Sequence, residues 1–165
     1  MRLRPWSALV IASLLVLVGC DHATKYAAES SLRDRPARRV LGSAVALEYR
    51  ENPGVAFNTE RVLPPGARAA VIVTAGVGAM AALAIALWRR RGRRSLETAA
   101  LLLIAGGAAG NLLDRLIRGH VIDFIHVRHW PVFNLADVWL VAGAALMLVA
   151  AGRATAADPR GAGPG

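Results

Sequence analysis

Cysteine and lysine are almost absent from this chain of 165 residues. Its single cysteine, Cys20, excludes a framework of disulfide bonds and a cysteine-rich zinc site. Lys25 is the only lysine among twenty basic residues, and acidic residues number eleven, so the net charge is +9. Basic chains often bind nucleic acid, but here the basic residues stand in blocks between apolar runs. We therefore expect no nucleic-acid partner.

Apolar runs are what the chain has in abundance. Hydrophobic residues make up 55% of the sequence, above the roughly 45–50% of an ordinary soluble domain. Four runs approach the roughly 20 residues that a helix needs to cross a bilayer. The predicted fold class is therefore an all-α membrane protein with four transmembrane helices, in one domain covering 1–152. We place the spans at about 6–28, 69–88, 96–113 and 135–152, and predict a disordered tail at 153–165.

The density of arginine predicts which way the spans cross the membrane. If the N-terminus is cytoplasmic, the inner segments are 1–5, 89–97 and 153–165, with nine arginines in 27 residues. The outer segments, 29–68 and 114–134, then hold ten arginines in 61 residues. Because cytoplasmic loops are enriched in Lys and Arg, we predict that both termini are cytoplasmic.

The first outer segment contains a strand pattern. Val45, Leu47 and Tyr49 alternate with small or charged residues, and this period of two predicts a β-strand. The Asn-Pro-Gly sequence at 52–54 follows directly and is typical of a turn. We predict a small extracytoplasmic β element here.

The first twenty residues are similar to a lipoprotein signal peptide. Basic residues precede an apolar stretch, and Leu17-Val18-Gly19-Cys20 fits the sequence that is cleaved before a lipidated cysteine. The helical pattern continues past Cys20, however, and three more spans follow. We favour the alternative that Cys20 is a small buried apolar residue of the first helix.

Two polar groups lie within or beside the apolar runs. Asp21 and Lys25 are four residues apart and so share one face of a helix. They are either a solvated pair at a helix end or part of a polar cluster facing the bundle interior. Asn111 and Asp114 also share a helix face, next to Arg115, whose guanidinium suits a carboxylate or a phospholipid phosphate.

Glycines precede the second of these polar groups. Gly106 and Gly110 have the spacing that lets two helix backbones approach each other closely, and Gly107 lies between them. We predict close helix packing at this position.

Two acids lie in apolar surroundings on the same predicted side of the membrane. Asp123 stands among Val, Ile and Phe residues, and Asp137 stands at the start of the fourth span. Two carboxylates close together share a proton, so one can activate water while the other protonates a substrate. The alternative is that each acid is a helix cap or a salt-bridge partner, and Asp137 is placed to cap the fourth span.

Three histidines are the residues that suggest a metal site. His126 and His129 are three residues apart and His120 precedes them, but the sequence has no HExxH pattern and no further ligand set. We expect no metal and no cofactor.

Five motifs in this order resemble the lipoprotein signal peptidase (signal peptidase II) family of bacterial intramembrane aspartic peptidases. They are Asp21-x-x-x-Lys25, Asn52-x-Gly54-x-Ala56-Phe57, Gly106-Gly107-Ala108-x-Gly110-Asn111-x-x-Asp114-Arg115, Gly119-x-Val121-x-Asp123-Phe124 and Phe133-Asn134-x-Ala136-Asp137. The resemblance covers nearly the whole chain. Two departures are His22, where the family pattern leads us to expect Gln, and a rather short interval between Asp123 and Asp137.

The resemblance implies a membrane aspartic endopeptidase that removes the signal peptide from diacylglyceryl-modified prolipoproteins, cleaving just before the lipidated cysteine. Its catalytic pair would fall on Asp123 and Asp137. Residues that bind substrate or support the pair would be Asp21, Lys25, Asn52, Gly54, Asn111, Asp114, Arg115 and Asn134. Further implied partners are membrane phospholipid and globomycin-type inhibitors. The protein would be a monomer in the bacterial cytoplasmic membrane, with its active site at the extracytoplasmic side.

A non-enzymatic interpretation stands beside this one. In this interpretation the chain is a multispan membrane protein or a proton-coupled transporter that uses its buried acids as a proton relay. That interpretation predicts activity coupled to a proton gradient and no peptidase defect when the acids are replaced.

Overall fold

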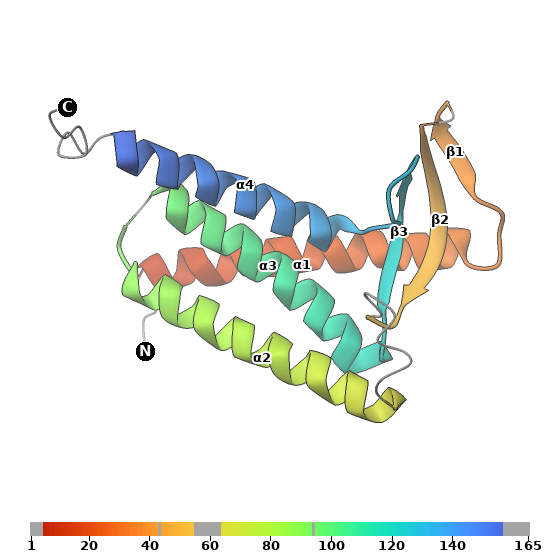
Figure 1. Cartoon of the computed structure of the whole chain (residues 1–165), viewed down its shortest axis with the longest axis horizontal. Helices are drawn as coiled ribbons and strands as arrows, with labels where there is room; N and C mark the ends of the chain where they lie inside the picture. Colours follow the sequence, from red (N-terminus) through yellow and green to blue (C-terminus); the bar gives the residue numbers. More distant parts are fainter. Residues whose placement is uncertain (1–4, 43, 55–63, 94, 157–165) are drawn as a thin grey trace, which may run out of the picture.

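Helices make up most of this computed structural model, which describes residues 5–42, 44–54, 64–93 and 95–156. The helices of this described part are α1 (Pro5–Leu32), α2 (Pro65–Arg89), α3 (Leu96–Arg118) and α4 (Leu135–Ala156). The strands are β1 (Arg38–Leu41), β2 (Val45–Asn52) and β3 (Val121–Val127). The helices form an elongated bundle, and the strands form a sheet at one end of it (Figure 1).

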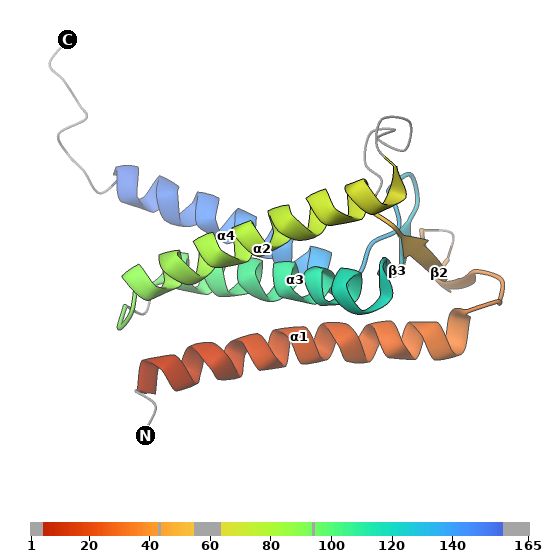
Figure 2. The same ribbon diagram turned by 90° about the horizontal axis from the view of Figure 1, so that it is seen from below.

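Helix α3 is the centre of the bundle. It packs against α1, α2 and α4, and α1 reaches far enough to contact β2 and β3 as well. Figures 1 and 2 show the start of α1 and the end of α4 at one end of the bundle, opposite the sheet. The bundle therefore has two distinct ends, one with a sheet and one with helix termini and a connecting turn.

The outer faces of the helices are apolar. All four helices are long enough to cross a membrane, and their most apolar windows have mean hydropathies between 1.5 and 2.3. Large side chains such as Leu15, Val141 and Leu148 leave at least 69% of their surface exposed. Apolar surface of this extent is suited to lipid rather than water. The chain is a multi-pass membrane protein with a small β element, which confirms the predicted fold class.

Helix α3 is longer than the predicted third span because its polar end is also helical. Its first turn is capped by the Ser95 hydroxyl, which accepts a hydrogen bond from the Thr98 N–H (3.3 Å). The helix ends at Arg118, and the next residue, Gly119, has a φ of +79°, the left-handed conformation that closes many helices. The polar residues after Leu113 therefore lie on α3 and not in a loop.

Helix α4 also runs further than predicted. It continues to Ala156, so residues 153–156 of the predicted disordered tail are helical. These residues contain two alanines and neither glycine nor proline, so nothing in them breaks the helix. Residues 157–165, the rest of the predicted tail, lie outside the described residues.

The three strands form one antiparallel sheet in the order β1-β2-β3. The predicted strand around Val45 is confirmed as β2, which pairs with β3 from Val45 with Val127 to Asn52 with Val121. The predicted turn follows β2: the Gly54 N–H donates to the Asn52 side-chain oxygen (2.8 Å), and Gly54 has a φ of +83°. The pairing places Asn52 beside the first residues of β3.

Cys20 is exposed on α1, so the expectation of a buried residue is wrong. The face of α1 that packs inward contains Asp21, Lys25 and Ala28, which are buried. Cys20 is one residue before Asp21 and so points about 100° away from this face. The helix is uninterrupted through this position.

Glycines let other elements approach α3 closely, as predicted. A methyl group on Gly106 would lie 2.7 Å from Leu17 Cβ of α1, and one on Gly107 would overlap the Ala136 carbonyl oxygen of α4. A methyl group on Gly110 would lie 2.5 Å from an Asp21 carboxylate oxygen. Real Cβ atoms do not approach other atoms this closely, so the packing requires glycine.

Replacing Gly110 with alanine is expected to destabilise the fold by about 1–3 kcal/mol, because the methyl group overpacks against a buried carboxylate. The matched control is Gly78→Ala on α2, where a methyl group meets nothing within 4 Å and alanine favours the helix. Thermal unfolding in detergent micelles measures both. An equal melting temperature for Gly110→Ala and wild type would contradict the tight packing.

Candidate active site

The chain doubles back after β3, and this brings Asn134 next to Asp123. The Phe133 carbonyl accepts hydrogen bonds from the N–H groups of Phe124 (3.0 Å) and Ile125 (2.8 Å), and the Phe133 N–H donates to the Ile125 carbonyl (3.0 Å). This pairing brings together the two ends of the short segment that separates Asp123 from Asp137. Asn134, the next residue, is fully buried.

Asn134 and Asp137 cap the start of α4 reciprocally. The Asn134 N–H donates to Asp137 Oδ2 (3.2 Å), and the Asp137 N–H donates to Asn134 Oδ1 (3.1 Å). This is a capping box, in which two side chains satisfy backbone donors at a helix start. The alternative interpretation of Asp137 as a helix cap is thus confirmed, and the cap also fixes the carboxylate in place.

The Asn134 side-chain amide links this cap to the other acid. Its Nδ2 donates to Asp123 Oδ1 (2.7 Å) and to Asn111 Oδ1 (3.1 Å). Asn111 Nδ2 in turn donates to Asp137 Oδ1 (2.8 Å). Asn134 therefore contacts both acids, which come from different elements, and the structure brings together Asp123 of β3 and Asp137 of α4.

A buried ion cluster lies on the far side of Asn111. Lys25 Nζ lies 2.7 Å from Asp21 Oδ2 and 2.8 Å from Asp114 Oδ2, and all three side chains are fully buried. Lys25 Nζ also donates to Asn111 Oδ1 (3.0 Å). The interpretation of Asp21 and Lys25 as a solvated pair is therefore wrong, and the interior cluster is the observed arrangement.

Two contacts fix the orientation of the Asn111 amide. Its oxygen accepts from Lys25 and from Asn134, so its NH₂ group is the one that faces Asp137. A carboxylate oxygen is an acceptor, which suits this orientation. The lone lysine thereby determines which end of an amide meets the candidate acid.

Asp21 connects α1 to the start of α4. Its Oδ1 accepts a hydrogen bond from the Ala136 N–H (2.9 Å). Ala136 lies in the first turn of α4, where unpaired N–H groups and the positive end of the helix dipole favour a negative charge. Asp21 is thus a helix cap supplied by a different helix.

The turn after β2 supports the site from the sheet side. Asn52 Nδ2 donates to Asp123 Oδ2 (2.9 Å). Gly54 lies beside Arg115, since a methyl group on Gly54 would meet the Arg115 guanidinium at 3.5 Å. Arg115 Nη1 donates to the Asn111 carbonyl oxygen (3.0 Å). All ten residues selected from the sequence therefore lie in one connected region where the sheet meets the bundle.

The two acids have different surroundings. Asp123 is only 4% exposed, and burial raises the pKa of its carboxyl. Hydrogen bonds from Asn52 and Asn134 oppose this shift, and the charge of Asp137 adds to it. Asp137 is half-buried and lines an apolar groove of about 390 Å³, together with Trp130, Phe133 and four small or branched residues of α4. Burial thus favours the protonated form of Asp123, while Asp137 faces an apolar groove.

Some contacts had no signal in the sequence. The donor to Asp21 is the backbone N–H of Ala136, which any residue would supply. His22 lies between Asp21 (3.8 Å) and Asp114 (3.7 Å), and Arg118 Nε lies 3.9 Å from Asp114. Among the described residues, no group of three His, Cys, Asp or Glu side chains is placed to hold a metal ion.

A family model decides the relationship. The model described as signal peptidase (SPase) II matches residues 13–152. The chain belongs to this family. It is therefore a membrane peptidase, and the match includes at least part of each of the four spans.

Curated relatives agree with signal peptidase II membership, and a solved structure shares the fold. The lipoprotein signal peptidase of Syntrophomonas wolfei is 40% identical over 137 residues, covering 83% of this chain and 88% of the relative. That of Pelotomaculum thermopropionicum is 39% identical over 138 residues, covering 84% and 86%. A solved bacterial membrane enzyme determined by the in meso method has a similar fold, with a TM-score of 0.69, 22% identity and 94% coverage of each chain.

Proposed function

We propose that this peptidase is of the aspartic type and that Asp123 and Asp137 are its catalytic pair. The function of the family and of its lipoprotein signal peptidase relatives is the removal of signal peptides from prolipoproteins, and the chain carries it out as a single four-span domain. The observation that supports the pair is the double contact of Asn134, which hydrogen-bonds to both carboxylates. A non-enzymatic role is not favoured.

The surroundings of the two acids suggest different roles. Asp123, buried and with a raised pKa, holds the proton and donates it to the carbonyl oxygen of the scissile amide. Asp137, at the start of α4 and facing the groove, takes a proton from water as the water oxygen bonds to the carbonyl carbon. The C–N bond then breaks as one hydroxyl of the tetrahedral intermediate returns its proton to Asp123, and the leaving nitrogen takes the proton held by Asp137.

The amides around the pair keep both carboxylates in position during this reaction. Asn52, Asn111 and Asn134 donate to the carboxylate oxygens and have no charge of their own to add. Both oxygens of each acid accept a hydrogen bond from an amide N–H, so the two carboxyl groups stay in place while the proton moves.

We propose that the groove beside Asp137 receives the apolar part of the substrate. Trp130, Phe133, Val138 and Val141 give it apolar walls that run along α4 away from the carboxylate. A signal helix and diacylglyceryl chains are apolar, so they are bound by burial of apolar surface. Cleavage would fall just before the lipidated cysteine, whose diacylglyceryl group reaches the surrounding lipid.

We further propose how the enzyme is placed. The end of the bundle where α1 begins and α4 ends also carries the arginines at 89–91 and 93, and it faces the cytoplasm. The sheet and the acid pair then lie at the extracytoplasmic surface of a bacterial cytoplasmic membrane, where the enzyme works as a monomer. Membrane phospholipid surrounds the enzyme, and globomycin-type inhibitors bind at the acid pair.

The test of this function uses a substrate with and without its lipid. Purified enzyme in detergent micelles is expected to cleave a diacylglyceryl-modified prolipoprotein and to leave the same precursor almost uncut when its cysteine is replaced by serine and is not lipidated. Intact-mass measurement of the product identifies the cleaved bond. Cleavage at another bond, or equal cleavage of both precursors, would contradict the proposed specificity.

The same mass measurement addresses the lipoprotein alternative for this chain. If Cys20 were a processing site, the purified protein would lack residues 1–19 and carry a diacylglyceryl group. We expect the mass of the chain with residues 1–19 present and without lipid on Cys20, since α1 is one continuous helix through this position.

A further inference from the structure

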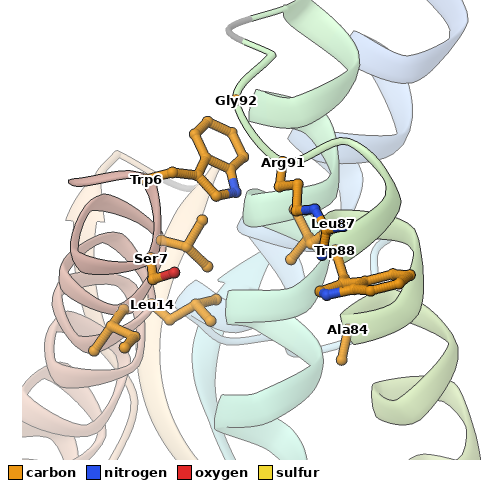
Figure 3. A pocket seen from close by; sticks show the side chains of 10 residues that line it. Trp6, Ser7, Leu14, Ala84, Leu87, Trp88, Arg91 and Gly92 are labelled. Atoms are coloured by element: carbon orange, nitrogen blue, oxygen red, sulfur yellow. The ribbon is translucent and has the colours of Figure 1, made fainter. Parts of the chain in front are cut away.

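A second cavity lies at the end of the bundle opposite the candidate active site. It has a volume of about 620 Å³ and lies between the first turns of α1 and the last turns of α2. Figure 3 shows Trp6 and Ser7 on the α1 side, with Ala84 and Trp88 on the α2 side and Arg91 just beyond the end of α2. Nothing in the proposed peptidase mechanism uses this cavity.

The cavity exists because α1 and α2 each pack on α3. Leu87 at its inner wall is buried in a cluster with Leu101 and Ala105 of α3, and Leu14 of α1 packs against the same cluster. The inner part of the cavity is therefore apolar and lies at membrane depth between two spans. An apolar gap at this depth is suited to a hydrocarbon chain.

The outer part of the cavity has a different chemistry. Trp6 and Trp88 stand at the ends of their spans, where tryptophan marks the boundary between hydrocarbon and headgroups. The Arg91 guanidinium lies 4.2 Å from the centre of the Trp88 ring, and the Ser7 hydroxyl is on the opposite wall. An arginine and a hydroxyl at the end of an apolar gap suit a phosphate that is attached to a hydrocarbon chain.

The neighbouring charges leave Arg91 available for this role. Arg90 forms a salt bridge with Glu97, whereas no salt bridge to Arg91 is found within the described part of the chain. Arg91 therefore keeps a positive charge that a bound anion can neutralise, and its position is set by the ring below it.

We propose that this cavity binds one anionic phospholipid, with an acyl chain between α1 and α2 and its phosphate at Arg91. Basic pockets between transmembrane helices bind anionic headgroups in this way. The site is separate from the groove beside Asp137, so its occupant is a resident lipid and not a substrate. Binding there would tie α1 to α2 at the end of the bundle away from the sheet.

Native mass spectrometry of the purified full chain tests the proposal. Lipid adducts are compared for phosphatidylglycerol and phosphatidylcholine of the same acyl composition. We expect phosphatidylglycerol to bind about fivefold more tightly and Arg91→Ala to abolish this preference. Arg93→Ala, which removes the same charge from the same turn but not from the cavity, is expected to change the preference less than about twofold.

A second pair of variants tests the acyl-chain part of the site without changing any charge. Ala84→Phe places a ring in the cavity and is expected to weaken binding of both lipids, whereas Ala82→Phe, on the exposed side of the same helix, is not. Equal binding of the two lipids to wild type, or equal effects of Arg91→Ala and Arg93→Ala, would overturn the proposal. So would a dimer in the spectrum that only Ala84→Phe dissociates, because the cavity would then hold a second copy of the chain.

Discussion

Replacing Asp123 or Asp137 with asparagine is expected to lower the rate of signal-peptide cleavage by at least about a hundredfold. Asparagine has the size and shape of the acid, so packing changes little, but its amide neither takes a proton from water nor supplies one to a carbonyl. Because the proposed mechanism uses one of them as base and the other as acid, each replacement alone removes a proton-transfer step. The measurement is kcat on a lipidated prolipoprotein with purified variants.

The matched control for both variants is Asp34→Asn. Asp34 is an exposed acid just beyond the end of α1 and has a positive φ of 61°, which asparagine tolerates well. The chemical change is the same, so its kcat is expected to equal that of wild type. Turnover within a few-fold of wild type by a folded Asp123→Asn or Asp137→Asn variant would rule out that acid as catalytic. The same assay separates this proposal from a proton relay, which predicts no loss of cleavage.

The parts of the fold that could be predicted from the sequence depend on local patterns. Each span is an apolar run long enough to cross a bilayer, whatever it packs against. The strand at Val45 follows from alternation, and the turn at 52–54 follows from the conformations that Asn and Gly favour. β3 was not predicted, because Val121–Val127 lacks alternation and owes its strand structure to pairing with β2.

The candidate site could be predicted only as a set of residues. Asp21 and Lys25 share a helix face by spacing alone, but their contacts to Ala136 and Asp114 cross between helices. No local pattern encodes which backbone N–H a carboxylate will meet. The role of Asn134 as the link between two acids depends on the chain doubling back at Phe133, which is set by tertiary pairing.

Replacing Lys25 with methionine is expected to destabilise the bundle strongly, costing about 3–5 kcal/mol of folding free energy. Methionine fills a similar volume but leaves two fully buried carboxylates, Asp21 and Asp114, without the cation that lies within 2.8 Å of both. Equilibrium unfolding in mixed micelles measures the loss. Arg33→Met, which removes a cation from exposed ion pairs with Glu29 and Glu51, is the control and is expected to change little.

A sharper form of this prediction follows from the charges of the buried cluster of Asp21, Lys25 and Asp114. Asp114→Asn leaves Asp21 and Lys25 as a neutral pair, so it is expected to cost less than Lys25→Met. The double variant with both changes leaves only Asp21, which still accepts from the Ala136 N–H. It is therefore expected to be more stable than Lys25→Met alone, and its loss is expected to fall about 0.5–3 kcal/mol below the sum of the two single losses. Strictly additive losses would show that Lys25 stabilises the fold by packing and not by its charge.

Lys25 also orients the Asn111 amide that donates to Asp137, a proposed catalytic acid, so stability is not its whole expected contribution. In the double variant the Asn111 amide loses the donor that directs its NH₂ group toward Asp137. We expect kcat to stay well below wild type even where stability is recovered, because Asp137 is no longer positioned by a fixed donor. Recovery of both stability and kcat in the double variant would mean that Asn134 alone orients Asn111, and that the lysine acts only on the fold.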